Sequence, residues 1–226
     1  MVTGIAAAAI AVVGGPFLFF HLIEGKAAAP LALATPSPSG SAGTSSSAGQ
    51  ASVAPDGIWK VASSSVVGYR VDEVLFGQSH TAVGRTSSIT GSMTVSGTTI
   101  TKATFTMDMT TVASDQSRRD AQFNGRIMET GTYPTATFTL TQPIELGSIP
   151  AAGVQRTFQA KGNLTLHGVI RTVTFSVTGQ LVGSTVQIAG SIPITFADWN
   201  IGNPSFGPVT TEDHGVLEFA LNFTHA

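Results

Sequence analysis

The sequence predicts an all-β domain, an antiparallel barrel or sandwich with one short helical insertion, preceded by an apolar N-terminal segment and a low-complexity linker. From residue 58 onward, apolar and polar residues alternate in several runs of strand length. A period of two residues is typical of a strand that buries one face. Turn-forming dipeptides separate these runs, and many strands at hairpin spacing favour an antiparallel barrel or sandwich.

The composition narrows the classes of function. Charged residues make up 11% of the 226 residues, and the formal net charge is −2. That charge gives no support for a nucleic-acid-binding surface. The chain contains no cysteine, which excludes disulfides, a thiolate nucleophile, cysteine-based zinc sites and a lipoprotein-type cysteine anchor.

The N-terminal stretch Gly4–Ile23 is apolar apart from His21. About 20 apolar residues suffice for a helix to cross a bilayer, so we expect residues 1–26 to form a transmembrane anchor. The alternative is a secretory signal peptide, because residues 27–29 and 32–34 both match an Ala-x-Ala cleavage pattern. Cleavage would make the protein secreted.

The region 27–56 is predicted to be a flexible linker. Its stretch Ala34–Pro55 is rich in Ser, Ala, Pro and Gly and nearly uncharged, so it buries too little apolar surface to fold alone. A flexible coil of that length spans roughly 25 Å. We therefore expect a tether that holds a folded domain, residues 57–226, on the extracytoplasmic side of a membrane.

Within the domain, alternation defines the inward-facing positions of the strands. These are Ala103, Phe105, Met107 and Met109; Ala136, Phe138 and Leu140; Val169, Val173, Phe175 and Val177; Val186, Ile188, Ile192 and Ile194; and Leu217, Phe219, Leu221 and Phe223. In the last run, Glu218 and Asn222 fall on the opposite face. Turns are predicted at Ser96-Gly97, Thr178-Gly179 and Gly183-Ser184.

The stretch Ser114–Glu129 breaks the alternation and predicts a helix. Ser114 or Asp115 is a suitable N-cap, whereas Gly125 weakens the helix. We therefore expect a short or broken helix that closes one end of the barrel. Its shared helical stripe consists of Arg119, Phe123 and Ile127.

Three sequence blocks, Arg118–Phe123 ("RRDAQF"), Thr132–Leu140 ("TYPTATFTL") and Gly162–Val177 ("GNLTLHGVIRTVTFSV"), resemble the YceI-like family in content, order and spacing. The resemblance extends over about Ile58 to Phe223. The chain departs from the family pattern in "NGRIME" after Phe123 and in the segment Phe196–Gly215.

The resemblance implies a lipocalin-like antiparallel β-barrel with a long apolar cavity for a polyisoprenoid lipid or isoprenoid quinone. Alternation alone fits a packed core equally well. The side chains that would line the cavity are Phe105, Met107, Met109, Phe123, Ile127, Phe138, Leu140, Leu164, Leu166 and Phe175.

Arg118, Arg119 and Asp120 have two interpretations. They form either a solvated helix face with a surface ion pair, or a polar clamp at the mouth of the barrel. Arginine suits a phosphate or pyrophosphate because its guanidinium binds two oxygens at once.

His167 is predicted to be structural. A zinc site needs three or four ligands, and the sequence has no HExxH or HxH spacing and no GxSxG motif. We expect His167 to shape a turn before Gly168 and to bond a carbonyl or a carboxylate such as Asp120; contact with a lipid head group is the alternative. Glu212, Asp213 and His214 fit a solvated turn.

The sequence thus predicts a lipid binder of the cell envelope, a carrier or sequestering protein, with no catalytic residue, metal or cofactor assigned. Its partners would be an isoprenoid-type lipid and, through the N-terminal segment, a membrane. One alternative is a hydrolase that acts on an envelope lipid through His167 or Asp120. The other is a structural or adaptor module whose barrel is filled by its own side chains. The sequence leaves the oligomeric state open.

Overall fold

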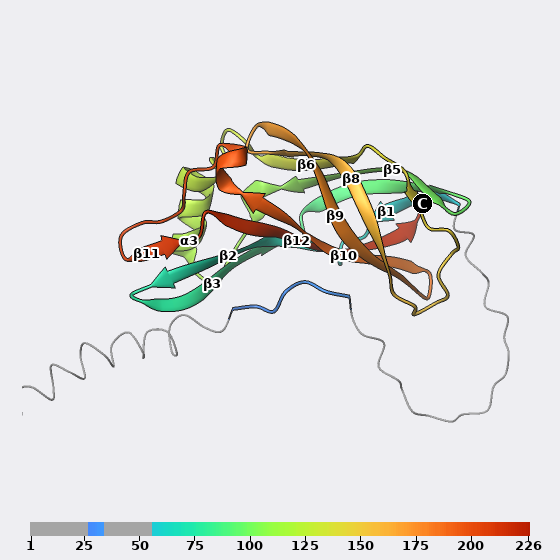
Figure 1. The fold of residues 1–226 in the computed structure, drawn as a ribbon, viewed down its shortest axis with the longest axis horizontal. Helices are drawn as coiled ribbons and strands as arrows, with labels where there is room; N and C mark the ends of the chain where they lie inside the picture. Colours follow the sequence, from blue (N-terminus) through green and yellow to red (C-terminus); the bar gives the residue numbers. More distant parts are fainter. Residues whose placement is uncertain (1–26, 34–55) are drawn as a thin grey trace, which may run out of the picture.

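A computed structural model describes residues 27–33 and 56–226 and shows an antiparallel β-barrel (Figure 1). Its strands are β1 (Gly57–Val61), β2 (Val66–Leu75), β3 (Gln78–Thr86), β4 (Ile89–Ser96), β5 (Thr99–Asp108), β6 (Thr135–Leu140), β7 (Ile144–Glu145), β8 (Arg156–Leu166), β9 (Val169–Val182), β10 (Thr185–Thr195), β11 (Val209–Thr211) and β12 (His214–His225). The helical segments are η2 (Met109–Thr111), α3 (Ser117–Gln122), η3 (Phe123–Ile127) and η4 (Phe196–Trp199).

The barrel closes through its first and last strands. The ring runs β1-β4-β5-β6-β8-β9-β10-β12, and β12 returns to β1 through the pairs Trp59↔His225 and Val61↔Phe223. The predicted all-β antiparallel barrel with one short helix is therefore confirmed. In a closed ring each strand has a neighbour on both sides, so the ring formed by the described residues has no edge strand.

β12 also supports a sheet extension at one end. Its segment Val216–Ala220 pairs with β2, which in turn pairs with β3 and β11. α3 and β11 lie at the same end of the barrel, and the C-terminus lies at the opposite end (Figure 1). The two ends are thus built differently.

The hairpin between β8 and β9 has a two-residue turn made by His167 and Gly168. Their φ angles are 48° and 74°, as a type I′ turn requires at both central positions. A Cβ on Gly168 would lie 2.6 Å from the Tyr133 ring, so this position also needs glycine for space. His167 shapes a turn, as predicted.

The turn predicted at Thr178-Gly179 is wrong. β9 continues through both residues, and Gly179 pairs with Arg156 on one side and Ile188 on the other. With ladders on both sides, this backbone is held extended. Turns do occur at the other two predicted places, between β4 and β5 and between β9 and β10.

The helical insertion is short and broken, as predicted. α3 ends at Gln122, and the chain continues as one π-helical turn, Phe123–Ile127. The predicted N-cap is wrong, because the cap position is Gln116. Ser114 instead donates to the Asp120 carboxylate through its amide, at 2.8 Å, and its hydroxyl, at 2.6 Å.

The predicted inward faces form the hydrophobic core. Among the described residues, no helix is both long enough and apolar enough to cross a membrane. The predicted anchor, residues 1–26, and the linker stretch 34–55 lie outside the described residues.

Candidate ligand-binding cavities

The barrel interior contains a cavity of about 200 Å³. Its walls are almost wholly apolar, and the polar side chains among them are Thr137 and Gln180. Aromatic rings form much of the wall. They are Trp59, Phe105, Phe138, Phe158, Phe175 and Phe219. Such a space favours an apolar chain, because burial of apolar surface is its main attraction.

Another cavity, of about 750 Å³, lies at the end that carries α3. Its walls come from β2, the end of β10, α3, η3 and the segment between η4 and β11. This cavity is more polar, since its lining includes Glu73, Arg118, Arg119 and Arg126. Its volume is within the usual range of ligand sites.

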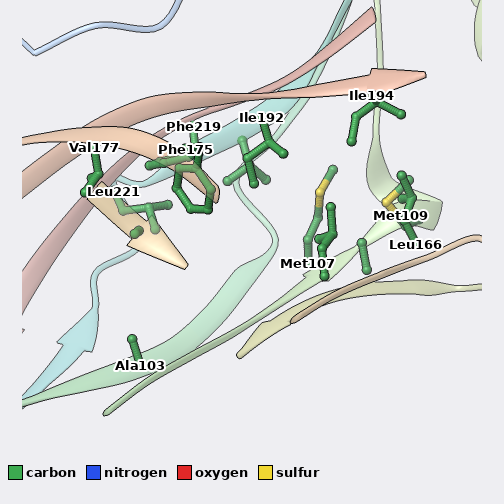
Figure 2. Close-up of a cluster of buried hydrophobic side chains, with 14 of the residues drawn as sticks. Ala103, Met107, Met109, Leu166, Phe175, Val177, Ile192, Ile194, Phe219 and Leu221 are labelled. Carbon is green, nitrogen blue, oxygen red and sulfur yellow. The ribbon is translucent and has the colours of Figure 1, made fainter. Parts of the chain in front are cut away.

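Met107 and Leu217 line both cavities, and they are the two residues that the linings share. Figure 2 shows Met107 between a group that contains Phe175 and Phe219 and a second group that contains Met109. The two cavities therefore meet at Met107 and Leu217.

The apolar residues predicted to line a cavity all lie on these walls. Phe105, Phe138, Leu140, Leu164 and Phe175 line the interior cavity; Met109, Phe123, Ile127 and Leu166 line the other; and Met107 lines both. Whether they contact a ligand stays a prediction. Arg118 and Arg119 line the larger cavity, but Asp120 and His167 line neither.

Arg119 belongs to a charged network at the wall of the larger cavity. Its guanidinium contacts Asp115 and lies 3.5 Å from the Glu73 carboxylate, which is also 3.1 Å from His80 Nδ1. Burial is the largest single influence and works to lower the pKa of Arg119, but the charges of Glu73 and Asp115 and the hydrogen bond to Asp115 help to raise that pKa overall. Arg119 thus stays cationic beside the cavity.

Tyr69 completes this wall. Its ring stacks on Phe123 with centroids 5.0 Å apart. Burial raises the pKa of the Tyr69 phenol, which keeps the group neutral.

Arg126 joins η3 to the segment between η4 and β11. Its guanidinium donates to the Pro204 carbonyl at 2.8 Å and lies 5.7 Å from the centre of the Phe206 ring. Nε also donates to Gln122 at 3.0 Å. Arg126, Pro204 and Phe206 all line the larger cavity, so this contact spans its wall.

His167 bonds a carbonyl, as predicted, but not Asp120. Nδ1 lies 3.2 Å from the Trp199 carbonyl, which can only accept, so Nδ1 carries the hydrogen. Nε2 is buried without a hydrogen-bond partner among the described residues; the Glu129 carboxylate is 3.7 Å away. Of the two predicted partners, the carbonyl is therefore the one found, while the Asp120 carboxylate accepts from Ser114.

One cluster of potential metal ligands occurs among the described residues, Glu212, Asp213 and His214, and all three are exposed. The hydrogen bond to Asp213 raises the pKa of His214. Exposure and adjacency in sequence fit the solvated turn expected here.

Glu73, Tyr69 and Arg126 were missed at the level of sequence. Tyr69, Val71 and Glu73 share one parity of β2, so a charge on an otherwise apolar face was a usable signal for Glu73. Arg126 gave no comparable signal, because its partner Pro204 is distant in sequence.

A family model for the YceI-like domain matches residues 59–223. A solved polyisoprenoid-binding domain from Saccharophagus degradans, implicated in plant cell wall breakdown, is 17% identical, with a TM-score of 0.60 over 75% of this chain and 98% of that one. BcnA from Burkholderia cenocepacia is 24% identical, with a TM-score of 0.52 over 68% of this chain and 95% of that one. No curated protein matches the chain significantly.

Proposed function

The chain belongs to the YceI-like family, and from this premise we propose that it binds a long-chain isoprenoid lipid or quinone in the barrel, without covalent chemistry. The observation that carries the proposal is the apolar cavity inside the barrel, which meets a more polar cavity at one end. The polyisoprenoid-binding domain of similar fold supports this ligand class.

The two cavities suit an amphiphile with one orientation. An apolar tail would occupy the interior, where each Å² of buried apolar surface contributes about 25 cal/mol. The polar end would face the larger cavity, where Arg118 is exposed and can reach a phosphate. The lining residues on β5 run from Ile100 to Met107, which corresponds to about 23 Å at roughly 3.3 Å per residue and favours a long ligand.

The proposed setting is the cell envelope, with the barrel on the extracytoplasmic side as a carrier or sequestering protein. The apolar stretch Gly4–Ile23 and the low-complexity residues 34–55 support an anchor followed by a linker.

The test is organic extraction of lipids from the purified full-length chain, followed by mass spectrometry. We expect a co-purified prenyl lipid, or uptake of an added long-chain prenyl alcohol. Ala103→Phe fills the interior and should lower lipid content, whereas the matched control Thr104→Phe places the same ring on the exposed face. Circular dichroism would verify that both variants are folded.

An empty barrel that takes up no prenyl chain would overturn the proposal in favour of the adaptor module. Hydrolysis of a prenyl phosphate by the purified chain, lost on His167→Ala with Asp120→Asn, would instead favour the enzyme.

A further inference from the structure

Glu218 is a buried carboxylate on the outside of the barrel. It lies on the outward parity of β12, yet it is only 3% exposed. Charged side chains are rarely buried so fully unless they are paired. An outward charge that is buried requires something on the outer surface to cover it.

Two arginines pair with Glu218. Arg85 Nη2 lies 2.7 Å from Oε1, and Arg70 Nε lies 3.4 Å from Oε2. Glu218, Gly68 and Arg85 form one row across β12, β2 and β3. Gly68 leaves the middle of that row without a side chain, so Arg85 reaches across it.

The same three side chains bind the backbone of Ala27–Leu33, which lies along the outside of the barrel (Figure 1). Arg70 donates to the Ala28 carbonyl at 2.6 Å, and Arg85 donates to the Ala29 carbonyl. The Leu31 amide donates to Glu218 Oε2 at 3.2 Å. The two arginines therefore donate to carbonyl oxygens, and the Glu218 carboxylate accepts from an amide.

The side chains of this segment are consistent with docking. Leu31 and Leu33 are half-buried, whereas Ala28, Ala29 and Pro30 are exposed. Pro30 separates the two carbonyls from the Leu31 amide and brings no N–H that would need a partner.

We propose that Glu218, Arg70 and Arg85 form a docking site for the chain's own segment Ala27–Leu33, which acts as a strap on the outer face. A docked strap would hold the barrel close to the apolar sequence that ends at Ile23, because three residues separate that sequence from Ala27. This proposal does not depend on the ligand in the barrel.

The absence of native cysteines allows a direct test with spin labels on the full-length chain. Labels at Ala32→Cys and Ser79→Cys are both at exposed positions. We expect a narrow distance distribution between them. Leu31→Pro, which removes the amide donor, should broaden it, whereas Leu31→Ala should largely preserve it. Loss of a hydrogen bond to a charged group corresponds to about tenfold to a hundredfold in the docking equilibrium.

Glu218→Ala should broaden the distribution as well, and Glu145→Ala, at an exposed carboxylate of β7, should not. Leu31→Pro leaves the barrel sequence intact, so it decides the matter if Glu218→Ala unfolds. A broad distribution in the parent chain, or a narrow one in both Leu31→Pro and Glu218→Ala, would overturn the strap. A short distance between two singly labelled chains would show docking onto a second copy and overturn docking within one chain.

Discussion

The backbone conformation and the contacts at position 167 explain why a histidine occurs there. His167 has a left-handed backbone with a φ of 48°, donates to the Trp199 carbonyl and packs its ring 4.5 Å from the Tyr133 ring centre. Histidine tolerates positive φ better than most residues. The side chain thus connects the β8–β9 turn to η4 and to the segment before β6.

We expect His167→Ala to lower the free energy of unfolding by about 1–2 kcal/mol, because a hydrogen bond and a ring contact are lost. His167→Asn should cost less, since asparagine adopts positive φ readily. Urea unfolding measures both, and lipid extraction should give the same content as the parent chain. A folded His167→Ala protein of parent stability that had lost its lipid would show that the residue contacts the ligand.

His214 provides a prediction on pH. Its hydrogen bond with Asp213 raises its pKa above the ordinary value of 6.5, so Asp213→Asn should return it toward that value in an NMR titration. Glu212→Gln should have a smaller effect, and the reverse order would contradict this cause. A raised folded-state pKa adds stability below the unfolded pKa and loses it as the pH rises through the folded value. Because His214 is fully exposed, the effect on stability should be slight.

At the level of elements, η3 and the segment between η4 and β11 form one wall of the larger cavity and are joined through Arg126. The π-helical turn at Phe123–Ile127 places Phe123 in the core while Arg126 reaches Pro204. Contacts of this kind determine how readily a cavity wall opens.

Arg126→Ala should speed the release of bound prenyl lipid to acceptor vesicles severalfold, because the contacts of Arg126 with Pro204 and Phe206 are lost. Hydrogen exchange in residues 200–208 should rise in parallel. Arg156→Ala is the matched control, since Arg156 bonds the Ser148 carbonyl in another loop. Equal release rates from the Arg126 and Arg156 variants would rule out this role.

How far the sequence predicts each element depends on how regular its pattern is. The inward face of β5 follows from strict alternation between Ala103 and Met107. β2 was harder to recognise, because Tyr69 and Glu73 carry polar groups on its inner face. A turn was predicted at Gly179 because glycine is common in turns. The residue type alone does not reveal that Gly179 pairs with a neighbouring strand on each side.

At the scale of the whole molecule, Met107 is one of the two residues at which the cavities meet. Its thioether side chain is flexible enough to adapt to a passing chain. The positions that line the cavities could be predicted from the sequence, because the two-residue period of a strand shows which face each residue lies on. The contacts of Glu218 with Arg85 and Leu31 could not be predicted, because that period does not identify partners that are distant in sequence.

Met107→Trp should separate the two cavities where they meet, and should shift the bound lipids toward shorter chains. The volume-conserving control Met107→Leu should retain the parent profile. Mass spectrometry of extracted lipids measures the profile, and thermal unfolding checks the fold. An unchanged chain-length profile in a folded Met107→Trp protein would mean that the ligand occupies one cavity alone.

Because the ring closes between β1 and β12, closure of the barrel must be a late step in folding. The ladder Trp59↔His225 joins segments from nearly opposite ends of the domain, and contacts of such wide separation form slowly. During synthesis the ring cannot close until β12 has left the ribosome. Until then, β1 and β10 each expose an unpaired edge, which is a hazard for aggregation. A chain of this topology is therefore most prone to aggregation before its last strand is available.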